Sequence, residues 1–407
     1  MASHSSFWSA SAAAALALCV CAAALQVPEG TEIQIRLKTK ASTQTSKPKD
    51  PVEAVVIAPV MVNDQFAIPA GALVRGSVEK ATQSSKGDER SVLALSFTEI
   101  EIEGTKVKLA AQLRAVENAR ESVDDKGQIS GILASDTISG RLDAGLNKLA
   151  ERAAGFADIL STVKKTILKE PESDVTYDAG VEIDLKLTAP LELRGPSSPG
   201  PAAKLKPISD EKALLDLVSA EPFQTMAQKP AKPSDITNVM LVGTPEQVQK
   251  AFTEAGWSSA AALSAQAKLE TFRAIAEQRG YKEAPVSVLL LEGKPPDLVF
   301  EKLNNTFAQR HHLRVWRRPS TFQDQPVWMI AATHDTGIDF SEQNRTFIHK
   351  IDSQIDRERS KVVNDLLLTG HVESLALVDR PAVPQKGQNA TGDSLETDAK
   401  IAVLVLQ

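Results

Sequence analysis

The sequence predicts a multidomain protein: an N-terminal all-β barrel or sandwich with a helical insertion, then a C-terminal α/β or α+β layered domain. Residues 31–117 alternate polar and apolar side chains in short runs, as strands with one solvated face do. After residue 235, apolar strand-like runs alternate with helical patterns, which is typical of layered folds. Residues 194–201, rich in proline and glycine, separate the two patterns as a linker would.

Composition limits the class of protein and its partners. A chain of 407 residues can form two or three domains, each with its own core. The hydrophobic fraction of 42% and the charged fraction of 24% are ordinary for a globular protein and exclude general disorder. A formal net charge of −6, without a long run of lysine or arginine, argues against nucleic acid as a partner.

The N-terminal segment is apolar and predicts export. Residues 12–25 are small or aliphatic and include three consecutive alanines, so we expect a signal peptide over residues 1–24. The run is shorter than the roughly 20 apolar residues that a membrane helix needs. Because Met1–Ser11 contains no lysine or arginine, an uncleaved hydrophobic tail is the alternative. We expect a periplasmic or secreted protein, and membrane association stays open.

The first domain is expected over residues 29–193, with several strands separated by turns rich in glycine and proline. Val181–Leu187 alternates like the earlier strands and could close the barrel after the insertion. The other strands are expected at Thr31–Leu37, Val52–Val62, Ala72–Val78, Val92–Ile102 and Lys106–Leu113.

The helical insertion is expected at about residues 128–170. Its apolar residues from Leu142 to Ile167 follow a heptad spacing with charged residues between them. The simpler interpretation is a helix that lies on its own barrel. The alternative is an exposed helix that pairs with a partner or a second copy, which predicts self-association through residues 142–167.

A linker with a short helix, Asp210–Ser219, is expected over residues 194–234, and the last domain over 235–407. Thr244 fits an N-cap with Pro245 and Gln247 behind it, and Gly256 fits the end of that helix. Further helices are expected at Ser259–Gly280, Asp297–Asn305 and Asp352–Leu368. Strands are expected at Ile236–Val242, Pro285–Leu291, Arg310–Arg317, Pro326–Thr333, Val372–Val378 and Lys400–Leu406, with a polar loop at residues 385–398.

Two stretches of the first domain, Gly30–Leu37 and Ile68–Val78, resemble the β-barrel of the TrbI-type conjugation channel component. In that family a helical excursion also interrupts the barrel before its last strand. The resemblance covers about residues 29–193. It implies an envelope scaffold and supplies no catalytic residue.

The last domain resembles the LssY C-terminal domain over about residues 235–407. The motifs that carry the resemblance occur in order, and they include Asn238–Gly243, Arg310–Trp316, Pro326–Trp328, His349–Asp352 and Asp356–Arg359. Leu291–Lys294 departs from the family, whose members tend to have an aromatic residue and an arginine there. The resemblance implies a bacterial envelope protein, in a family often attached to phosphatase-like membrane segments and without an assigned reaction.

Polar side chains concentrate between residues 310 and 359, where four of the six histidines lie. Strand alternation places His312, Arg314 and Trp316 on one face of their strand, and His311 on the other with Leu313. We expect a ligand pocket in this stretch, formed by Arg310, His311, His312, Arg314, Trp316, His334, Asp335 and His349.

Three interpretations of this stretch stay open. His312, His334 and His349 could bind a divalent metal, with Asp352 or Asp356 as a catalytic base. Alternatively, Asp352, Asp356 and Arg359 form an exposed ion-pair ladder and the histidines are structural. In the third interpretation, arginines bind a phosphate or carboxylate: Arg310, Arg314, Arg317, Arg318 and Arg345.

The sequence therefore predicts an exported binding or assembly protein of the cell envelope, whose partner is an envelope protein or a phosphorylated or other anionic ligand. The alternative is a hydrolase, metal-assisted in one version, that acts on a phosphorylated or lipid-derived envelope substrate. No G-x-S-x-G or phosphate-loop motif is present to support a more specific reaction.

Overall fold

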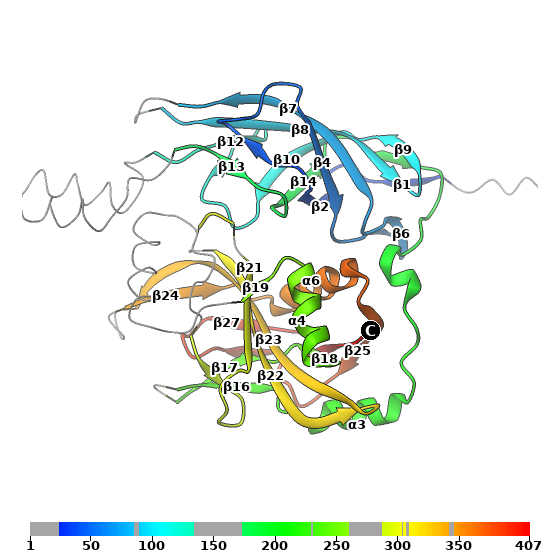
Figure 1. Cartoon of the computed structure of the whole chain (residues 1–407), viewed down its shortest axis with the longest axis vertical. Helices are drawn as coiled ribbons and strands as arrows, with labels where there is room; N and C mark the ends of the chain where they lie inside the picture. The colour runs from blue at the N-terminus through cyan, green and yellow to red at the C-terminus, as the bar shows by residue number, and fades with distance from the viewer. Residues whose placement is uncertain are drawn as a thin grey trace, which may run out of the picture.

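The structure is a computed structural model that describes residues 24–84, 89–133, 173–228, 231–259, 287–302, 304–306, 309–341 and 346–407. Two bodies lie one above the other, joined at one side by the linker (Figure 1). The predicted signal peptide apart from Ala24, the heptad segment 142–167 and the helix predicted from Ser259 lie outside the described residues. Self-association through that segment stays a prediction.

The N-terminal body is a nine-stranded antiparallel sheet that curls into a nearly closed barrel. β14, Glu182–Leu187, pairs with both β2 and β10, so it has the closing role predicted for it. The other strands are β2 (Glu32–Leu37), β4 (Pro51–Val56), β7 (Leu73–Thr82), β8 (Val92–Ile102), β9 (Thr105–Lys108), β10 (Ala111–Val116), β11 (Ser122–Val123) and β12 (Gln128–Ser130).

Alternation forms the barrel core. Ile33, Ile35 and Leu37 of β2 point inward and are buried, while the residues between them are more exposed. Gly76 lies where β7 bulges against β8, and a Cβ there would be 1.8 Å from the Ser96 carbonyl oxygen. Short pairs complete the body: β1 (Leu25–Val27) with β15 (Leu191–Leu193), β3 (Ala41–Ser42) with β13 (Thr176–Tyr177), and β5 (Val60–Val62) with β6 (Gln65–Ile68).

The C-terminal body is built on an eight-stranded sheet with the order β19-β21-β22-β23-β18-β28-β25, and β24 also pairs with β23. The pairing is antiparallel except between β18 and β28, so the layered domain is of the α+β kind. The strands are β18 (Val239–Val242), β19 (Ser258–Ser259), β21 (Leu298–Lys302), β22 (Arg310–Phe322), β23 (Gln325–Ser341), β24 (Thr346–Ile351), β25 (Val372–Asp379) and β28 (Lys400–Leu406).

Each face of this sheet carries its own core. Leu313 and Val315 pack with helices α4 (Pro245–Glu254) and α6 (Ile355–Thr369), on the face turned toward the barrel (Figure 1). Trp316 packs on the other face, with α3 (Glu211–Ala220). That face is also covered by a small sheet of β16 (Gln224–Ala227), β17 (Pro233–Ile236) and β20 (Leu289–Leu290). The 3₁₀ helix η2 (Gly200–Lys204) lies in the connection between the bodies.

The helix ends predicted from capping residues agree with the structure. Thr244 and Gln247 form the predicted capping box of α4, and Gly256 follows its end with a φ of +85°. Asp210 caps α3 by accepting a hydrogen bond from the Ala213 amide at 3.0 Å.

Several element predictions were wrong. The segment predicted as a helix from Asp297 to Asn305 contains strand β21, because pairing with β22 outweighs its local preference. The strand predicted at Ile236–Val242 is two strands, separated where the Asn238 side chain bonds the backbone of Ala332 at 3.0 Å. The predicted loop at residues 385–398 contains the hairpin β26 (Lys386–Gln388) and β27 (Ser394–Glu396). The linker predicted over residues 194–234 contains β16 (Gln224–Ala227) and the first residues of β17 (Pro233–Ile236).

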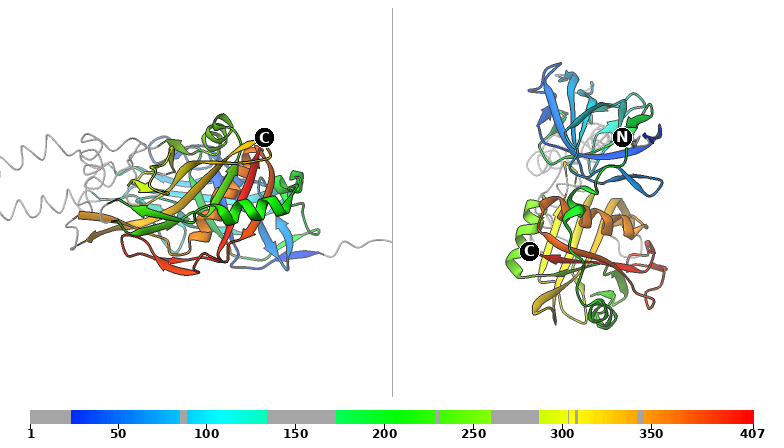
Figure 2. Two further views of the ribbon diagram at one scale, coloured as in Figure 1. Left: turned by 90° about the horizontal axis from the view of Figure 1, so that it is seen from below. Right: turned by 90° about the vertical axis from the view of Figure 1, so that its right-hand side faces the viewer.

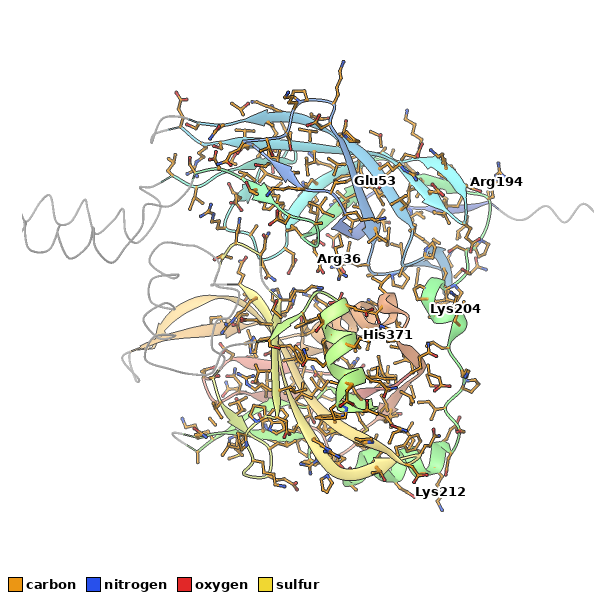
Figure 3. The ribbon with its side chains drawn as sticks, in the orientation of Figure 1. Arg36, Glu53, Arg194, Lys204, Lys212 and His371 are labelled. Carbon is orange, nitrogen blue, oxygen red and sulfur yellow. The ribbon has the colours of Figure 1, made fainter. Side chains whose placement is uncertain are left out.

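The two bodies meet through polar side chains. Arg36 of the barrel points toward the C-terminal body, whose helix α6 lies opposite (Figure 3). Asn305 donates to the Glu121 carboxylate at 2.7 Å and accepts from the Arg120 amide at 2.9 Å. The views at right angles also show α6 at the side of the C-terminal body that faces the barrel (Figure 2). Among the helices that the structure describes, none is long and apolar enough to cross a membrane.

Candidate ligand-binding site

A cleft of about 600 Å³ lies between the barrel and helix α6. Both bodies line it: strand β14 and the turn after β10 from the barrel, and β22, β23 and α6 from the C-terminal body. Its charged lining is mostly acidic, with six carboxyl groups against two cations. The carboxyl groups belong to Glu117, Glu182, Asp184, Asp352, Asp356 and Glu358, and the cations are Arg357 and Lys361.

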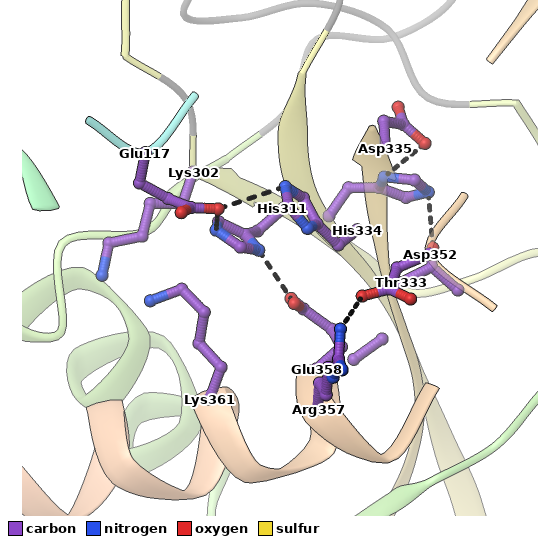
Figure 4. A network of polar contacts seen from close by, with 12 residues as sticks. Glu117, Lys302, His311, Thr333, His334, Asp335, Asp352, Arg357, Glu358 and Lys361 are labelled. Atoms are coloured by element: carbon purple, nitrogen blue, oxygen red, sulfur yellow. Dashed lines mark hydrogen bonds and ion pairs between the residues drawn. The ribbon is translucent and has the colours of Figure 1, made fainter. Parts of the chain in front are cut away.

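Two histidines from neighbouring strands stack at the inner end of the cleft (Figure 4). His311 of β22 and His334 of β23 are register partners, so both side chains lie on the same face of the sheet. Their ring centroids are 4.1 Å apart and their planes differ by 23°. This is the face covered by α6, whose first turns approach the two rings.

Glu358 of α6 holds His311 in place. Its Oε2 lies 2.8 Å from His311 Nδ1, and both side chains are nearly fully buried. Burial raises the pKa of Glu358 to about 7 against the opposing effects of His334 and Lys361. Burial likewise holds the pKa of His311 well below its ordinary value, so its imidazole is neutral. When Glu358 is ionised, His311 donates Nδ1–H to it and carries a lone pair on Nε2.

Glu117 approaches the two rings from the barrel. Its Oε1 lies 3.4 Å from His334 Nε2 and 3.6 Å from His311 Nε2. Burial, with the nearby Asp184, raises the pKa of Glu117 to about 7. Burial, with the adjacent His311, lowers the pKa of His334 to about 4. His334 Nε2 also lies 3.0 Å from Asn118 Oδ1, in the turn where Asn118 takes a φ of +53°.

Two acceptors in this group have no hydrogen-bond partner among the described residues. They are His311 Nε2 and Glu358 Oε1. The relative exposure of these two residues is 3% and 4%, so solvent does little to compensate them. A buried polar atom without a partner costs roughly 1–3 kcal/mol, and such atoms mark places where a ligand supplies the missing contact.

A cluster of buried ion pairs lies behind the histidines and joins the two bodies. Glu182 of β14 binds Arg36 Nη2 at 2.7 Å and Lys302 Nζ at 3.0 Å. Asp365 of α6 binds Lys302 Nζ at 2.9 Å and also pairs with Arg36. Lys361 contacts both carboxylates. Burial alone would raise the pKa of Glu182, but Lys302, Lys361 and Arg36 bring it well below its ordinary value.

Comparison with known families bears on the C-terminal body. Residues 220–401 match the model of the LssY C-terminus family. This confirms the resemblance drawn from the sequence motifs and extends it N-terminally to include β16 and β17. His311, His334 and Glu358 lie inside the LssY C-terminus segment, whereas Glu117 and Glu182 come from the barrel.

Other comparisons add little. No match was found among curated proteins. The structure of ComB10 of the Com type IV secretion system of Helicobacter pylori is similar at 13% identity, over 43% of this chain and 94% of that chain, with a TM-score of 0.23. A similarity of that degree supports no inference about this chain, and the similarity of residues 29–193 to TrbI-type barrels stays a resemblance.

The C-terminal body divides the predicted pocket between the two faces of its sheet. His312 follows His311 in β22 and therefore points to the opposite face. There its Nε2 lies 2.9 Å from Thr333 Oγ1 and its Nδ1 3.5 Å from Asp335 Oδ1. The structure thus does not bring His312 together with His334, as the predicted metal set required. The side chain of His349 and all of Arg345 lie outside the described residues.

The predicted anion-binding arginines are already bound to carboxylates on that opposite face or at its edge. Arg310 pairs with Glu301 at 3.0 Å and Asp335 at 3.1 Å, and Arg314 pairs with Asp235 at 3.0 Å. Trp316 is buried in the same core and donates Nε1–H to the Lys294 carbonyl at 3.1 Å. Arg318 pairs with Glu221 and Glu292, and Arg317 is exposed.

The two predicted catalytic acids do line the cleft, but each has a structural role. Asp352 precedes α6, which begins at Ile355, and its Oδ1 accepts from the Gln354 amide at 2.9 Å. Asp356 binds Arg359 at 3.0 Å, as the ion-pair interpretation expected. Arg359 is buried, however, and Asp398 completes the pair at 2.7 Å, so the predicted exposed ladder is wrong in its exposure.

Sequence reasoning did not single out Glu117, Asn118, Glu182, Glu358 or Lys361 as site residues. A signal existed for Glu358, because it occupies the apolar face of α6 between Ile355 and Val362. Asp365 shares that face, and its burial has the same periodicity. No local pattern marks Glu117, which reaches the site from a different domain.

Proposed function

We propose that the chain is an exported envelope protein that binds a small cationic ligand in the cleft between its barrel and its LssY C-terminus domain. One observation carries the proposal. His311 Nε2 and Glu358 Oε1 are buried acceptors without a hydrogen-bond partner among the described residues, and both residues line an acid-rich cleft. A cation or a cationic hydrogen-bond donor provides what such a lining lacks.

The charges favour a cation over the anion that the sequence predicted. Six carboxyl groups line the cleft against Arg357 and Lys361. Lys361 is already bound to Glu182 and Asp365, and Arg357 lies 3.5 Å from Asp352. Asp356 is paired with Arg359, so Glu117, Asp184 and Glu358 are the lining acids without a lysine or arginine partner among the described residues. An anion would therefore enter a field of like charge, whereas a cation would be attracted.

Export and an envelope location rest on different features. The apolar segment of residues 12–25 has the character of a signal peptide. The match of residues 220–401 to the LssY C-terminus model supports an envelope setting, because resemblance to that family implies a bacterial envelope protein. Fractionation of the native host, with the chain detected in periplasm, membrane and medium, tests the location directly.

Binding is tested by calorimetric titration of the purified protein with putrescine, lysine amide, Mg²⁺ and Zn²⁺, and with phosphate as an anionic comparison. We expect at least one cation to bind, and the Glu117→Gln and Glu358→Gln variants to bind it less tightly. Asp379→Asn, a change at an exposed residue of β25, is the matched control and should bind normally. Binding of phosphate alone, or of no probe, contradicts the proposal.

A second candidate function is hydrolysis, and one contact favours it. Glu358 lies 2.8 Å from His311 Nδ1, so the carboxylate orients a neutral imidazole whose Nε2 can take a proton from water. Hydrolysis of p-nitrophenyl phosphate and p-nitrophenyl acetate, each compared with His311→Ala, tests this. Activity that is present in wild type and lost in His311→Ala would establish the hydrolase. If wild type shows no activity, binding remains as the single proposed function.

A further inference from the structure

We propose that the cation is a divalent transition-metal ion of the zinc type, bound by Glu117 Oε1, His311 Nε2 and His334 Nε2. The inference rests on the proposed function of the cleft as a cation-binding site, and it names the ligand. It differs from the metal set expected from the sequence, because it replaces His312 and His349 with His311 and Glu117.

The spacing of the three donor atoms fits one metal ion (Figure 4). All three lie within 4.8 Å of one another. Glu117 Oε1 is 3.4 Å from His334 Nε2 and 3.6 Å from His311 Nε2. Zinc binds nitrogen and oxygen at roughly 2.0–2.2 Å, which places the donors of a tetrahedral site roughly 3.3 Å apart. Rotation of the two imidazole rings, whose nitrogens lie within 4.8 Å of one another, would bring all three donors to this spacing.

His311 is prepared for such a role by the residue behind it. Glu358 accepts from Nδ1 at 2.8 Å, which fixes the ring and leaves the Nε2 lone pair directed toward Glu117. Histidine ligands in metal sites commonly donate their second N–H to a carboxylate in this way. His311 Nε2 is buried and has no hydrogen-bond partner, so metal binding would not displace an existing contact there.

His334 requires one exchange. Its Nε2 lies 3.0 Å from Asn118 Oδ1, an arrangement in which the ring nitrogen donates. A metal takes the lone pair of this nitrogen, so the hydrogen bond to Asn118 is replaced by a metal–nitrogen bond. The two rings also have to turn, because a metal lies near the plane of each imidazole that binds it, and these planes are nearly parallel, 23° apart, with centroids separated by 4.1 Å.

The surroundings of the site carry more carboxyl groups than cations. Glu117, Asp184, Glu182, Glu358 and Asp365 lie around the two histidines, and Asp335 and Asp352 act on His334 as well. The opposing cations are Arg36, Lys302 and Lys361. A metal ion would add positive charge where carboxyl groups are in excess, and buried charges are stable only when they are compensated.

The donor set selects a class of metal. Two imidazoles and one carboxylate suit zinc and neighbouring transition ions, whereas magnesium and calcium prefer oxygen donors throughout. Three protein donors leave a four-coordinate ion with one position open to the cleft, for water or for a ligand group. Because Glu117 belongs to the barrel and both histidines to the LssY C-terminus domain, the ion would also bridge the two bodies.

The test is metal binding by full-length protein without a polyhistidine tag, with Co²⁺ as a spectroscopic probe and Zn²⁺ in competition. Wild type should bind one equivalent, with the visible absorption of four-coordinate Co²⁺, and Zn²⁺ should displace it. His311→Gln, His334→Gln and Glu117→Gln should each lose this spectrum. Glu358→Gln should weaken binding roughly 10–100-fold, as loss of a carboxylate behind a ligand histidine does.

His312→Gln is the matched control. His312 is the next residue, it is as buried as His311, and its side chain points to the other face of the sheet. This variant should bind one equivalent, as should His371→Gln, whose histidine pairs with Glu254 away from the cleft. Circular dichroism of every variant reports folding.

Three outcomes would overturn the metal site. In the first, wild type binds no stoichiometric metal. In the second, both His311→Gln and His334→Gln bind metal as wild type does. In the third, His312→Gln loses binding although it folds. If the ligand variants do not fold, X-ray absorption of zinc-loaded wild type replaces them and should show two imidazole ligands. If the protein binds putrescine but no metal ion, the zinc inference is refuted and the proposed function stands. If it binds neither putrescine nor a metal ion, the proposed function is refuted too.

Discussion

The two faces of strand β22 differ in what their buried polar groups contact. On the face toward α3, the ion-paired face, Arg314 binds Asp235 and the Ser287 carbonyl, and His312 contacts Thr333. On the face toward the barrel, His311 and Glu358 line the cleft, and His311 Nε2 and Glu358 Oε1 have no hydrogen-bond partner among the described residues. Both faces place polar side chains in apolar strands, so burial of polar groups alone does not mark a site. Contact with the cleft separates the candidate site from a structural network.

The largest expected effect is on the ion-paired face. Arg314→Met removes the guanidinium that lies 3.0 Å from Asp235 and leaves that carboxylate buried without its cation. We expect a loss of roughly 3–5 kcal/mol in the free energy of unfolding. Urea denaturation followed by circular dichroism measures it, with exposed Arg317→Met as the control. A loss below about 1 kcal/mol would show that this face is not held by its ion pairs.

The next effect concerns the junction of the two bodies. Glu182 and Asp365 have pKa values below their ordinary ones, because Lys302, Lys361 and Arg36 outweigh the effect of burial. A depressed carboxyl pKa contributes stability above the ordinary pKa, and this stability is lost as the pH falls through the folded-state pKa.

Stability should therefore decline as the pH falls below the ordinary carboxyl pKa of about 4. Glu182→Gln should be less stable than wild type at pH 7 and should show a shallower acid decline. Thermal melts between pH 3 and pH 8 measure this, with exposed Glu79→Gln as a control on the outside of the barrel. Parallel pH curves for wild type and Glu182→Gln would contradict it.

The smallest effect belongs to the face toward the barrel. Glu358→Met removes a buried carboxyl group that has an unpaired oxygen, and it also removes the acceptor that lies 2.8 Å from His311 Nδ1. Because these two changes act in opposite directions, we expect the free energy of unfolding to stay within about 1 kcal/mol of wild type while the variant loses cation binding. Urea denaturation measures it. A loss above roughly 3 kcal/mol would mean that Glu358 serves the fold and not the cleft.

Local patterns predicted much of the framework. The capping box at Thr244, the alternation of β2 and the closing strand at Glu182–Leu187 all follow from residues near one another in sequence. Alternation also separated His311 from His312 correctly. The helix predicted from Asp297 failed because its partner strand, β22, decides its conformation and is not visible in the local sequence.

The site itself was only half predictable. The register between β22 and β23 decides whether His334 lies on the same face of the sheet as His311 or as His312. In the structure it pairs His334 with His311. Glu117 reaches the histidines only because the barrel docks on α6 through Glu182, Arg36 and Lys361. Contacts of this kind depend on the packing of two domains, so no spacing rule within either domain reveals them.

The most direct test of the comparison is a crystal of the full chain grown with one equivalent of Zn²⁺ and measured at the zinc absorption edge. The account predicts one anomalous peak within bonding distance of Glu117, His311 and His334, and none beside His312. A peak beside His312 and Asp335, or no peak in the cleft, would contradict it.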